Sequence, residues 1–430
     1  MQPVIGIDFG TTNSVVAVLH ADGRAQTVRF GPDALEMFRS VLCFAAEDSN
    51  GGNKLRHSAG PGAIDAYLDD PLDSRLIMSM KTYLAQRSFS ETRIYGRRFT
   101  LEDLIATFLR HMLAEAGELP RNARIIVGRP VRFAGQNPDD ALGVRRLTAA
   151  FSQAGLPDLE HALEPEGAGY RFARGLTRPA NVLIGDFGGG TSDFSVLRFD
   201  PHGKDRVTAL ANTGIGIAGD VFDYRIIDAV ISPLLGKGDT YIVAGMGSGT
   251  ALPVPPEYFS AFARWHLLSL MRTPKTLRAI KEVAAQSAHP ERLGALVTVI
   301  EEELGYQLYR VVSGVKAALS RDREALLCFR HGRIAIEQVI TRAQFESWIA
   351  PDLAPLAATV DTALAQAGLC ADAIDHVFLT GGTSFVPAVR RIFSDRFGAA
   401  KVNAGKVEAG SEFVSVAEGL ALIGRDRQAA

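Results

Sequence analysis

The stretch VIGIDFGTTNSVVAV (residues 4–18) returns in outline as NVLIGDFGGGTSDFSVL (residues 181–197). Each consists of an apolar segment that ends in Asp-Phe-Gly, a turn rich in Gly and Thr, and a second apolar segment. Short apolar runs bounded by Gly are typical of buried strands joined by a tight turn. The sequence therefore predicts the same hairpin twice, at two places far apart in the chain.

The chemistry of this hairpin indicates an anion site. An Asp at the end of a buried strand projects beyond the sheet, and neighbouring Gly residues expose backbone N–H groups. If the two hairpins face each other, Asp8 and Asp186 repel unless a divalent cation lies between them. A polyphosphate would complete the oxygen shell of that cation. We therefore expect a nucleoside triphosphate site, with Mg²⁺ between Asp8, Asp186 and Asp193. The phosphates would be clasped by Gly10, Thr11, Thr12 and Asn13 and by Gly188, Gly189, Gly190 and Thr191. The alternative is that both segments are plain strand turns.

Two further Gly-rich segments bear on a nucleotide. In HVFLTGGTSFVPAVRRIF (376–393), a strand leads through Gly381, Gly382, Thr383 and Ser384 into a helix, and a base or ribose can lie against such a loop. GIGIAG (214–219) matches G-x-G-x-x-G, with Asp239 about 20 residues on, as in dinucleotide-binding folds. We favour a different interpretation, in which Gly219 and Asp220 begin a helix that points at the same phosphates. The G-x-x-x-x-G-K-[ST] pattern of P-loop proteins does not occur.

Composition excludes several classes of protein. Lys plus Arg number 46 and Asp plus Glu 48 among 430 residues, for a net charge of −2. This balance argues against nucleic-acid binding and against a membrane surface. Three scattered cysteines indicate a reducing compartment. We see neither a signal peptide nor an apolar run that could cross a bilayer, so we expect a cytoplasmic protein and a monomer.

Strands and helices alternate along the chain, which predicts an α/β fold with a central sheet. We expect helices over 100–117 and 139–156 in the first half, and a mostly helical inserted subdomain over 60–95. In the second half we expect a helix over 220–231, a divergent segment that continues through helices to about 320, and helices over 341–367, 387–397 and 413–424.

Five motifs in order resemble those of the ATPase domain of DnaK-type 70-kDa heat-shock chaperones, within the actin-like ATPase superfamily. The two hairpins resemble the phosphate motifs, and LTGGTSFVP (379–387) the adenosine motif. EPEGAGY (164–170) and VSVAEGLAL (414–422) resemble the two connecting motifs. The resemblance covers nearly the whole chain and is strongest to the YegD-like branch.

This resemblance implies the actin-like ATPase fold, with two ribonuclease H-like lobes, inserted subdomains, and ATP and Mg²⁺ in a central nucleotide cleft. We expect lobe I over 1–178 with an insertion at about 45–100. Lobe II would follow over 179–405 with an insertion at about 232–315, and a C-terminal helix over 406–430 would return to lobe I. The second insertion is the candidate surface for a protein partner.

The resemblance also implies roles for single residues. Asp8, Asp186 and Asp193 would hold hydrated Mg²⁺. Thr191 would orient or relay a proton for the attacking water, which Asp186 or Glu164 could position, and Pro165 would be a hinge that senses the phosphates. VKAALS (315–320) resembles the helix that contacts adenosine through Lys316 and Ser320.

Departures from the family pattern concern turnover and clients. The lysine that reaches the γ-phosphate in the family is expected near 59–66, where Ile64 stands instead. Lys81 could substitute for it, although a structural role is favoured. Phe385 replaces an arginine and could stack on adenine or belong to the core. The sequence ends at IGRDRQAA, so we expect no peptide-clamping domain.

Three functions fit these observations. The favoured one is an ATP-binding, slowly hydrolysing, chaperone-like conformational switch. The alternatives are a sugar kinase, for which a substrate base cannot be placed, and a filament-forming actin relative.

Overall fold

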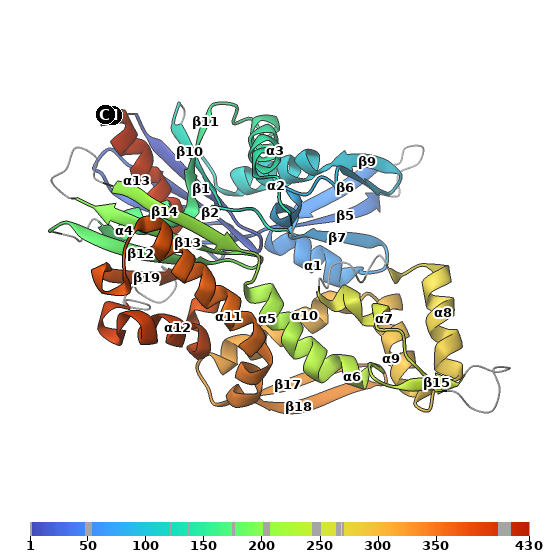
Figure 1. Ribbon diagram of the computed structural model, residues 1–430. Helices are drawn as coiled ribbons and strands as arrows, with labels where there is room; N and C mark the ends of the chain where they lie inside the picture. Colours follow the sequence, from blue (N-terminus) through green and yellow to red (C-terminus); the bar gives the residue numbers. More distant parts are fainter. Residues whose placement is uncertain are drawn as a thin grey trace. The chain divides into compact units, whose positions relative to one another are not determined.

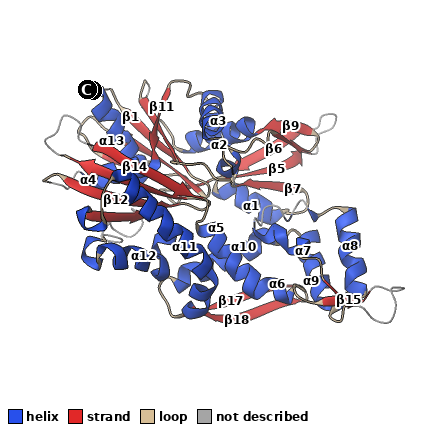
Figure 2. Cartoon of the chain, in the orientation of Figure 1, coloured by secondary structure: helices blue, strands red, loops and turns tan. Residues whose placement is uncertain are grey.

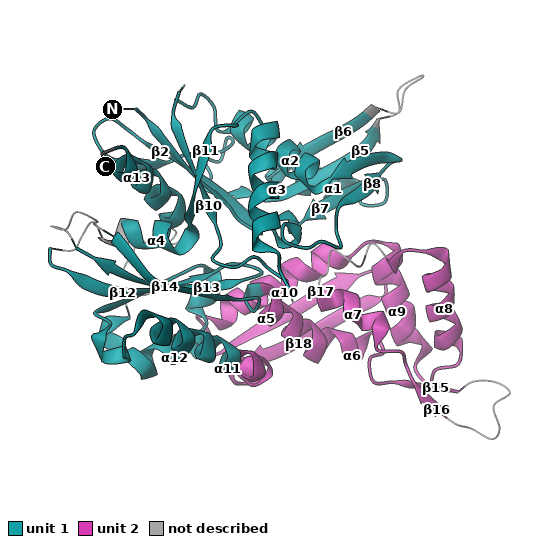
Figure 3. Cartoon of the chain, turned by 45° about the horizontal axis from the view of Figure 1, so that its top comes forward, with its two compact units in different colours: residues 1–219, 353–430 teal, residues 220–352 magenta. Residues whose placement is uncertain are grey.

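The computed structural model describes residues 2–47, 54–120, 122–135, 137–173, 177–200, 207–242, 251–263, 268, 271–402 and 414–429. The chain forms two compact units (Figure 3). The first comprises Met1–Gly219 and Leu353–Ala430, and the second Asp220–Asp352.

The first hairpin lies in the middle of a mixed sheet with the strand order β11-β10-β1-β2-β3 (Figures 1 and 2). The strands are β1 (Val4–Phe9), β2 (Asn13–Leu19), β3 (Ala25–Thr27), β10 (Arg124–Arg129) and β11 (Leu159–Leu163), with β4 (Phe38–Arg39) paired to β2. β1 runs antiparallel to β2 and parallel to β10. The first of the two predicted hairpins is therefore present.

The second hairpin repeats this arrangement. Its sheet has the order β14-β13-β12-β19, and an isolated parallel bridge joins Val377 of β19 to Val402 where the first sheet has its fifth strand. The strands are β12 (Ala180–Phe187), β13 (Ser192–Phe199), β14 (Val207–Ile215) and β19 (His376–Thr380). β12 runs antiparallel to β13 and parallel to β19, as β1 does to β2 and β10. The expected α/β architecture of an actin-like ATPase fold is confirmed.

Two helices form the layer between these sheets. α13 (Ser415–Ala429) packs on β1, β2 and β10, α4 (Glu164–Ala173) packs on β12 and β13, and the two helices pack on each other. Glycine permits the approach, because a methyl group on Gly419 would lie 1.7 Å from the carbonyl oxygen of Gly167. The two connecting motifs therefore meet in the centre of the first unit.

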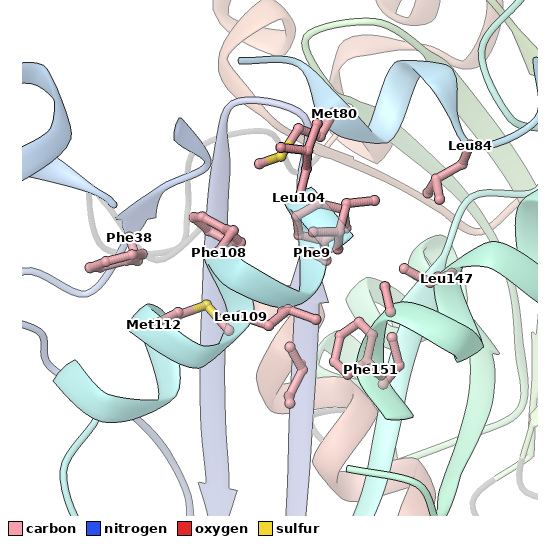
Figure 4. Packing of buried hydrophobic residues seen from close by; sticks show 14 of the residues in the cluster. Phe9, Phe38, Met80, Leu84, Leu104, Phe108, Leu109, Met112, Leu147 and Phe151 are labelled. Atoms are coloured by element: carbon pink, nitrogen blue, oxygen red, sulfur yellow. The ribbon is translucent and has the colours of Figure 1, made fainter. Parts of the chain in front are cut away.

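The outer faces are also covered by helices. α2 (Leu101–Glu115) begins with a capping box in which Thr100 and Asp103 satisfy each other's backbone N–H groups. It packs beside α3 (Asp140–Gln153), and both bury apolar side chains in one core with β1 (Figure 4). In the second lobe, Phe393 of α12 (Pro387–Phe397) contacts Phe187 and Phe194.

Residues 60–95, expected to be mostly helical, are a mixture of helix and strand, so that prediction was wrong. Besides α1 (Pro61–Asp69), this range contributes β7 to the sheet β6-β5-β7 and β8 to the hairpin β8–β9. The strands are β5 (Val41–Glu47), β6 (Lys54–Ala59), β7 (Ser74–Met78), β8 (Glu91–Ile94) and β9 (Arg97–Thr100). Short strands such as Ser74–Met78 are too brief for periodicity to separate them from a helix. A single 3₁₀ turn, η1 (Met80–Tyr83), follows β7.

The second unit is mainly helical. It contains α6 (Ser232–Leu234), α7 (Glu257–Ser260), α8 (Pro274–Ala285), α9 (Pro290–Glu301), α10 (Gly305–Leu319) and the hairpins β15 (Thr240–Ile242)–β16 (Ala251–Pro253) and β17 (Glu324–His331)–β18 (Ile334–Thr341). α5 (Gly219–Ile226) begins at the unit boundary, and α11 (Arg342–Ala367) crosses the second boundary. Within the described ranges, no helix has the length and apolarity needed to span a bilayer.

Candidate functional site

The structure brings the turns of the two hairpins together inside the first unit. A methyl group built on Gly190 would lie 3.6 Å from Oγ1 of Thr82 and 4.0 Å from Oγ1 of Thr11. Gly190 belongs to the second hairpin and Thr11 to the first, and the charges of Asp8 and Asp186 act on each other. The predicted pairing of these two aspartates is thus the arrangement that the chain adopts.

Strand register explains how the carboxylates reach this point. Asp186 lies directly opposite Asp193 on the neighbouring strand and beside Thr380 on the other side. Asp8 occupies the same place in the first sheet, but Val15 stands opposite it. The second hairpin therefore supplies two carboxylates, and the first supplies one.

A buried ion pair completes the cluster. Nζ of Lys81 lies 2.6 Å from Oε1 of Glu164, and both side chains are 10% exposed or less. Lys81 comes from the turn η1, and Glu164 is the first residue of α4. Asp8, Asp186, Asp193, Glu164 and Lys81 form a group that we term the acidic cluster; it carries four carboxylates and one ammonium.

The three aspartates of the acidic cluster hold their protons more tightly than usual. Burial, followed by repulsion from Glu164, raises the pKa of Asp8 to about 8 and that of Asp186 to about 7. The same two causes raise the pKa of Asp193 to about 7. Burial lowers the pKa of Lys81, but attraction to Glu164 and to the aspartates outweighs it, so the pKa lies above its usual value. A cation brought into the cluster would relieve the repulsion.

Hydrogen bonds fix the position of Asp193. The Thr191 hydroxyl donates to Oδ2 over 3.1 Å, and the backbone N–H of Arg132 donates to Oδ1 over 3.4 Å. A methyl group on Gly214 would lie 2.5 Å from that Oδ1. Gly214 is therefore needed inside β14 for the approach of Asp193, and it does not begin a dinucleotide-binding turn.

The oxygen-rich acidic cluster suits a hard divalent cation. Among the described residues, however, no group of three or more His, Cys, Asp or Glu side chains is arranged to hold a metal ion. Mg²⁺ in phosphate sites keeps several waters and takes one or two carboxylates together with phosphate oxygens. Asp8, Asp186 and Asp193 therefore fit a hydrated ion, held through water, better than a fully dehydrated one.

The phosphate-loop candidates surround the cluster. Oδ1 of Asn13 accepts a hydrogen bond of 3.1 Å from Arg39, which orients the amide at the end of the first turn. In the second turn, the N–H of Gly188 donates to the carbonyl of Thr191 over 2.9 Å. The N–H of Gly219 reaches the carbonyl of Gly188 over 3.4 Å, so the first residue of α5 lies beside the second turn.

The loop over residues 381–384 lies directly behind the second hairpin. Gly381 has φ +83°, and a methyl group on it would lie 2.0 Å from the carbonyl oxygen of Phe187. Thr383 and Ser384 are buried, and the Ser384 hydroxyl donates to the carbonyl of Gly381 over 2.6 Å. Phe385 is half-buried, with the guanidinium carbon of Arg390 5.7 Å from its ring centroid. One face of Phe385 thus carries a cation–π contact.

The remaining nucleotide candidates belong to the second unit. Nζ of Lys316 lies 2.8 Å from Oδ2 of Asp223, and the Ser320 hydroxyl donates to the carbonyl of Lys316 over 3.1 Å. Burial raises the pKa of Asp223 to about 6 against the pull of Lys316, and it also raises the pKa of Asp220. These residues form a cluster of their own within that unit.

Sequence reasoning missed three contributors to the site. Thr82 and the backbone N–H of Arg132 have no motif that marks them, and Lys81 was considered but placed second. One feature of the sequence could have placed Lys81. Met80 and Leu84 are apolar residues at helical spacing on either side of it, and both are buried, which is typical of a short helical turn anchored in the core. Ile64, the residue at the expected lysine position, lies on α1 and is half-buried.

Part of the chain matches a family of known proteins. The family model described as "Hsp70 protein" matches residues 304–425. The matched segment includes α10, the loop over residues 381–384 and most of α13. The two hairpins lie outside it, so their assignment depends on the geometry described above.

Proposed function

Because the chain belongs to the Hsp70 family, we propose that it binds ATP together with hydrated Mg²⁺ at the acidic cluster and hydrolyses it slowly. Family membership gives the chain a nucleotide-binding, chaperone-like role. The residues of the site, the slow turnover and the YegD-like branch belong to the proposal.

The observation that carries this proposal is the position of Lys81. The family's phosphate lysine is missing from its expected segment, yet the ammonium of Lys81 lies among Glu164, Asp8 and Asp186. A buried lysine beside glycine-rich turns can donate to a phosphate oxygen as a point charge. We infer that Lys81 has the role of the missing lysine, in place of the structural role favoured from the sequence.

The chain's own residues support binding and a slow reaction in the following way. Gly10–Asn13 and Gly189–Thr191 offer backbone N–H groups and hydroxyls to the phosphates, while the N–H of Gly188 closes the second turn. Bound Mg²⁺ would supply the positive charge that lets a polyphosphate approach four carboxylates. On binding, Lys81 would exchange Glu164 for the terminal phosphate, which frees Glu164 to orient a water. Thr191, held by Asp193, would then accept or relay the proton of that water.

This exchange provides the conformational switch. Glu164 begins α4, and α4 packs against α13 through the close contact of Gly167 with Gly419. A change in the partner of Glu164 therefore acts on the helix layer between the two sheets. ATP can shift the conformation only by the contacts that it makes better in one state than in the other.

Titration calorimetry with ATP tests the proposal. We expect saturable binding of ATP with Mg²⁺ and much weaker binding in EDTA. Lys81→Met should weaken ATP binding, and Lys281→Met, which removes an exposed lysine paired with Glu301, should leave it unchanged. Absence of saturable binding by the unaltered chain would overturn the proposal.

Two further measurements separate the alternatives. Release of ADP that rises with one member of a sugar panel would favour the sugar kinase, and light scattering that rises on addition of ATP would favour a filament-forming relative. We expect neither signal.

A protein partner at the second insertion, about residues 232–315, remains part of the proposal. Leu234 and Ile242 are 41% and 54% exposed there, so the insertion offers apolar contacts.

A further inference from the structure

The turn that carries Lys81 is anchored by its apolar neighbours. Ser79 has φ +55°, a left-handed conformation that is costly for a residue other than Gly, and the 3₁₀ turn η1 follows at once. Met80 and Leu84 are 2% and 0% exposed and lie in the core of the first lobe, where Leu147 of α3 packs near Leu84 (Figure 4). These apolar side chains fix the two ends of the turn, but they cannot form hydrogen bonds with its backbone carbonyls.

The backbone carbonyls of the turn are held by one side chain from α3. Nη1 of Arg146 donates to the carbonyls of Tyr83, Leu84 and Gln86 over 3.3, 3.4 and 3.1 Å. The end of a helical turn favours a cation, and its carbonyls can accept a second hydrogen bond, since those of Tyr83 and Gln86 also accept from the N–H groups of Gln86 and Phe89. Arg146 satisfies both needs of this turn.

Arg146 is itself held from the other side. Its Nε lies 3.4 Å from Oε1 of Glu102, in the first turn of α2, and only 10% of its side chain is exposed. The guanidinium therefore joins α2, α3 and the Lys81 turn. Its neighbour Arg145 is exposed and offers a matched control on the same helix.

We propose that Arg146 is a positioning residue that holds Lys81 in place for the terminal phosphate of ATP. This inference rests on the proposed function, because it assigns Lys81 to that phosphate. Arg146 donates to the backbone of the turn and contacts the acidic cluster only through it. Without Arg146 the three carbonyls lose a shared donor. The turn is then held less firmly, and the Lys81 side chain adopts several positions instead of one.

The consequence is selective among nucleotides. ATP has the phosphate that Lys81 would reach, whereas ADP lacks it. Loss of Arg146 should therefore weaken the binding of ATP more than that of ADP. A merely structural role would weaken both equally, through the general stability of the first lobe.

The test is a double-mutant cycle on the ratio of ATP to ADP affinity, measured by calorimetry with Mg²⁺. The proteins are the unaltered chain, Arg146→Met, Lys81→Met and the double variant, with Arg145→Met as the control. We expect Arg146→Met to lower the ratio by about tenfold and to have no further effect when Lys81 is already Met. Arg146→Lys, which keeps the charge but loses the planar fork, should restore part of the ratio.

Several results would overturn the inference. One is an equal loss of ATP and ADP affinity in Arg146→Met. Another is an undiminished effect of that substitution in the Lys81→Met background. If Arg146→Met does not fold, Arg146→Lys is measured in the same cycle, and an ATP to ADP ratio equal to that of the unaltered chain refutes the positioning role. Failure of the unaltered chain to bind ATP would instead refute the proposed function.

Discussion

The two hairpins share a strand ladder but differ in their charges. In both, a buried Phe follows the aspartate and a fully buried Ser stands opposite that Phe. The residue opposite the aspartate differs, since Asp8 faces Val15 and Asp186 faces Asp193. The first lobe contributes its cation from an inserted turn, through Lys81, and has no matching second carboxylate.

This difference shows how a duplicated scaffold acquires an asymmetric site. The repeated ladder places one carboxylate, Asp8 or Asp186, near the end of the first strand of each hairpin, which is a geometric result of the fold. Divergence then makes the second hairpin more acidic, through Asp193, and the first lobe supplies a lysine from its inserted turn. A polyphosphate is itself asymmetric, because its terminal phosphate needs contacts that the inner ones do not.

The largest effect is expected from making the first hairpin resemble the second, by Val15→Asp. Val15 is 2% exposed and packs with Val414 and Ala417 of the α13 segment, so the new carboxylate would be buried without a partner. We expect a loss of about 4 kcal/mol or more of unfolding free energy. Chemical denaturation followed by circular dichroism measures it.

Val15→Ala is the control for Val15→Asp. It removes only apolar atoms and should cost about 2 kcal/mol. If the two variants prove equally stable, the surroundings of Val15 are as polar as those of Asp193, and the contrast between the hairpins is wrong.

The next largest effect is expected from Lys81→Met in the absence of nucleotide. Removing one partner of a buried ion pair leaves Glu164 uncompensated beside three aspartates, and we expect a loss of about 3 kcal/mol at pH 8. The loss should shrink at pH 5, where Asp8, Asp186 and Asp193 have taken up protons and repel Glu164 less. Urea denaturation at both pH values measures the difference.

Lys281→Met serves as the matched control in the second unit. Lys281 and Glu301 are 55% and 40% exposed, so this substitution should cost less than about 1 kcal/mol. Equal costs for the two lysines would mean that Lys81 is as well hydrated as a surface residue.

The contrast between Asp8 and Lys81 also marks how far sequence reasoning reached. Asp8, Asp186 and Thr191 could be predicted from the sequence. Each lies in or beside a short apolar strand and a Gly-rich turn, and these are recognised from consecutive residues alone. Lys81 could not be placed with the same certainty. Its position depends on the left-handed φ of Ser79 and on donors from α3, a helix some 60 residues further along the chain. The strands of the inserted sheet were missed for a similar reason, since β5 pairs with β7 across an intervening helix.

A smaller effect is expected from pH, and its sign follows from the raised pKa values. Asp8, with a pKa of about 8, and Asp186 and Asp193, with pKa values of about 7, keep protons in the folded state that the unfolded chain releases near pH 4. Between about pH 4 and pH 8 the folded state binds more protons, so their contribution to stability falls as pH rises. Lys81, whose pKa is raised, stays protonated through this window, so its contribution changes there only as the aspartates around it take up protons.

The measurement is unfolding free energy against pH in EDTA, for the unaltered chain and for Asp8→Asn. Other groups titrate in both proteins, so the difference between the two curves isolates Asp8. We expect Asp8→Asn to gain stability relative to the unaltered chain as pH rises from 5 to 8.5. A difference that shrinks over this range would show that Asp8 ionises readily and that the cluster is not strained by its charges.

The smallest effect on stability, with a clear effect on binding, is expected from Gly190→Ala. The backbone of Gly190 does not have a positive φ, and the new methyl group would meet Thr82 and Thr11 at ordinary contact distances of 3.6 and 4.0 Å. We therefore expect a change within about 0.5 kcal/mol in unfolding free energy. The methyl group would nevertheless stand between the two turns, where a phosphate must pass close to the backbone, and should weaken ATP binding about tenfold.

Gly216→Ala is the control, because a methyl group there meets nothing within 4 Å. If both variants bind ATP like the unaltered chain, the space between the hairpins does not hold the phosphates, and the likeness of the two turns reflects their shared strand geometry alone.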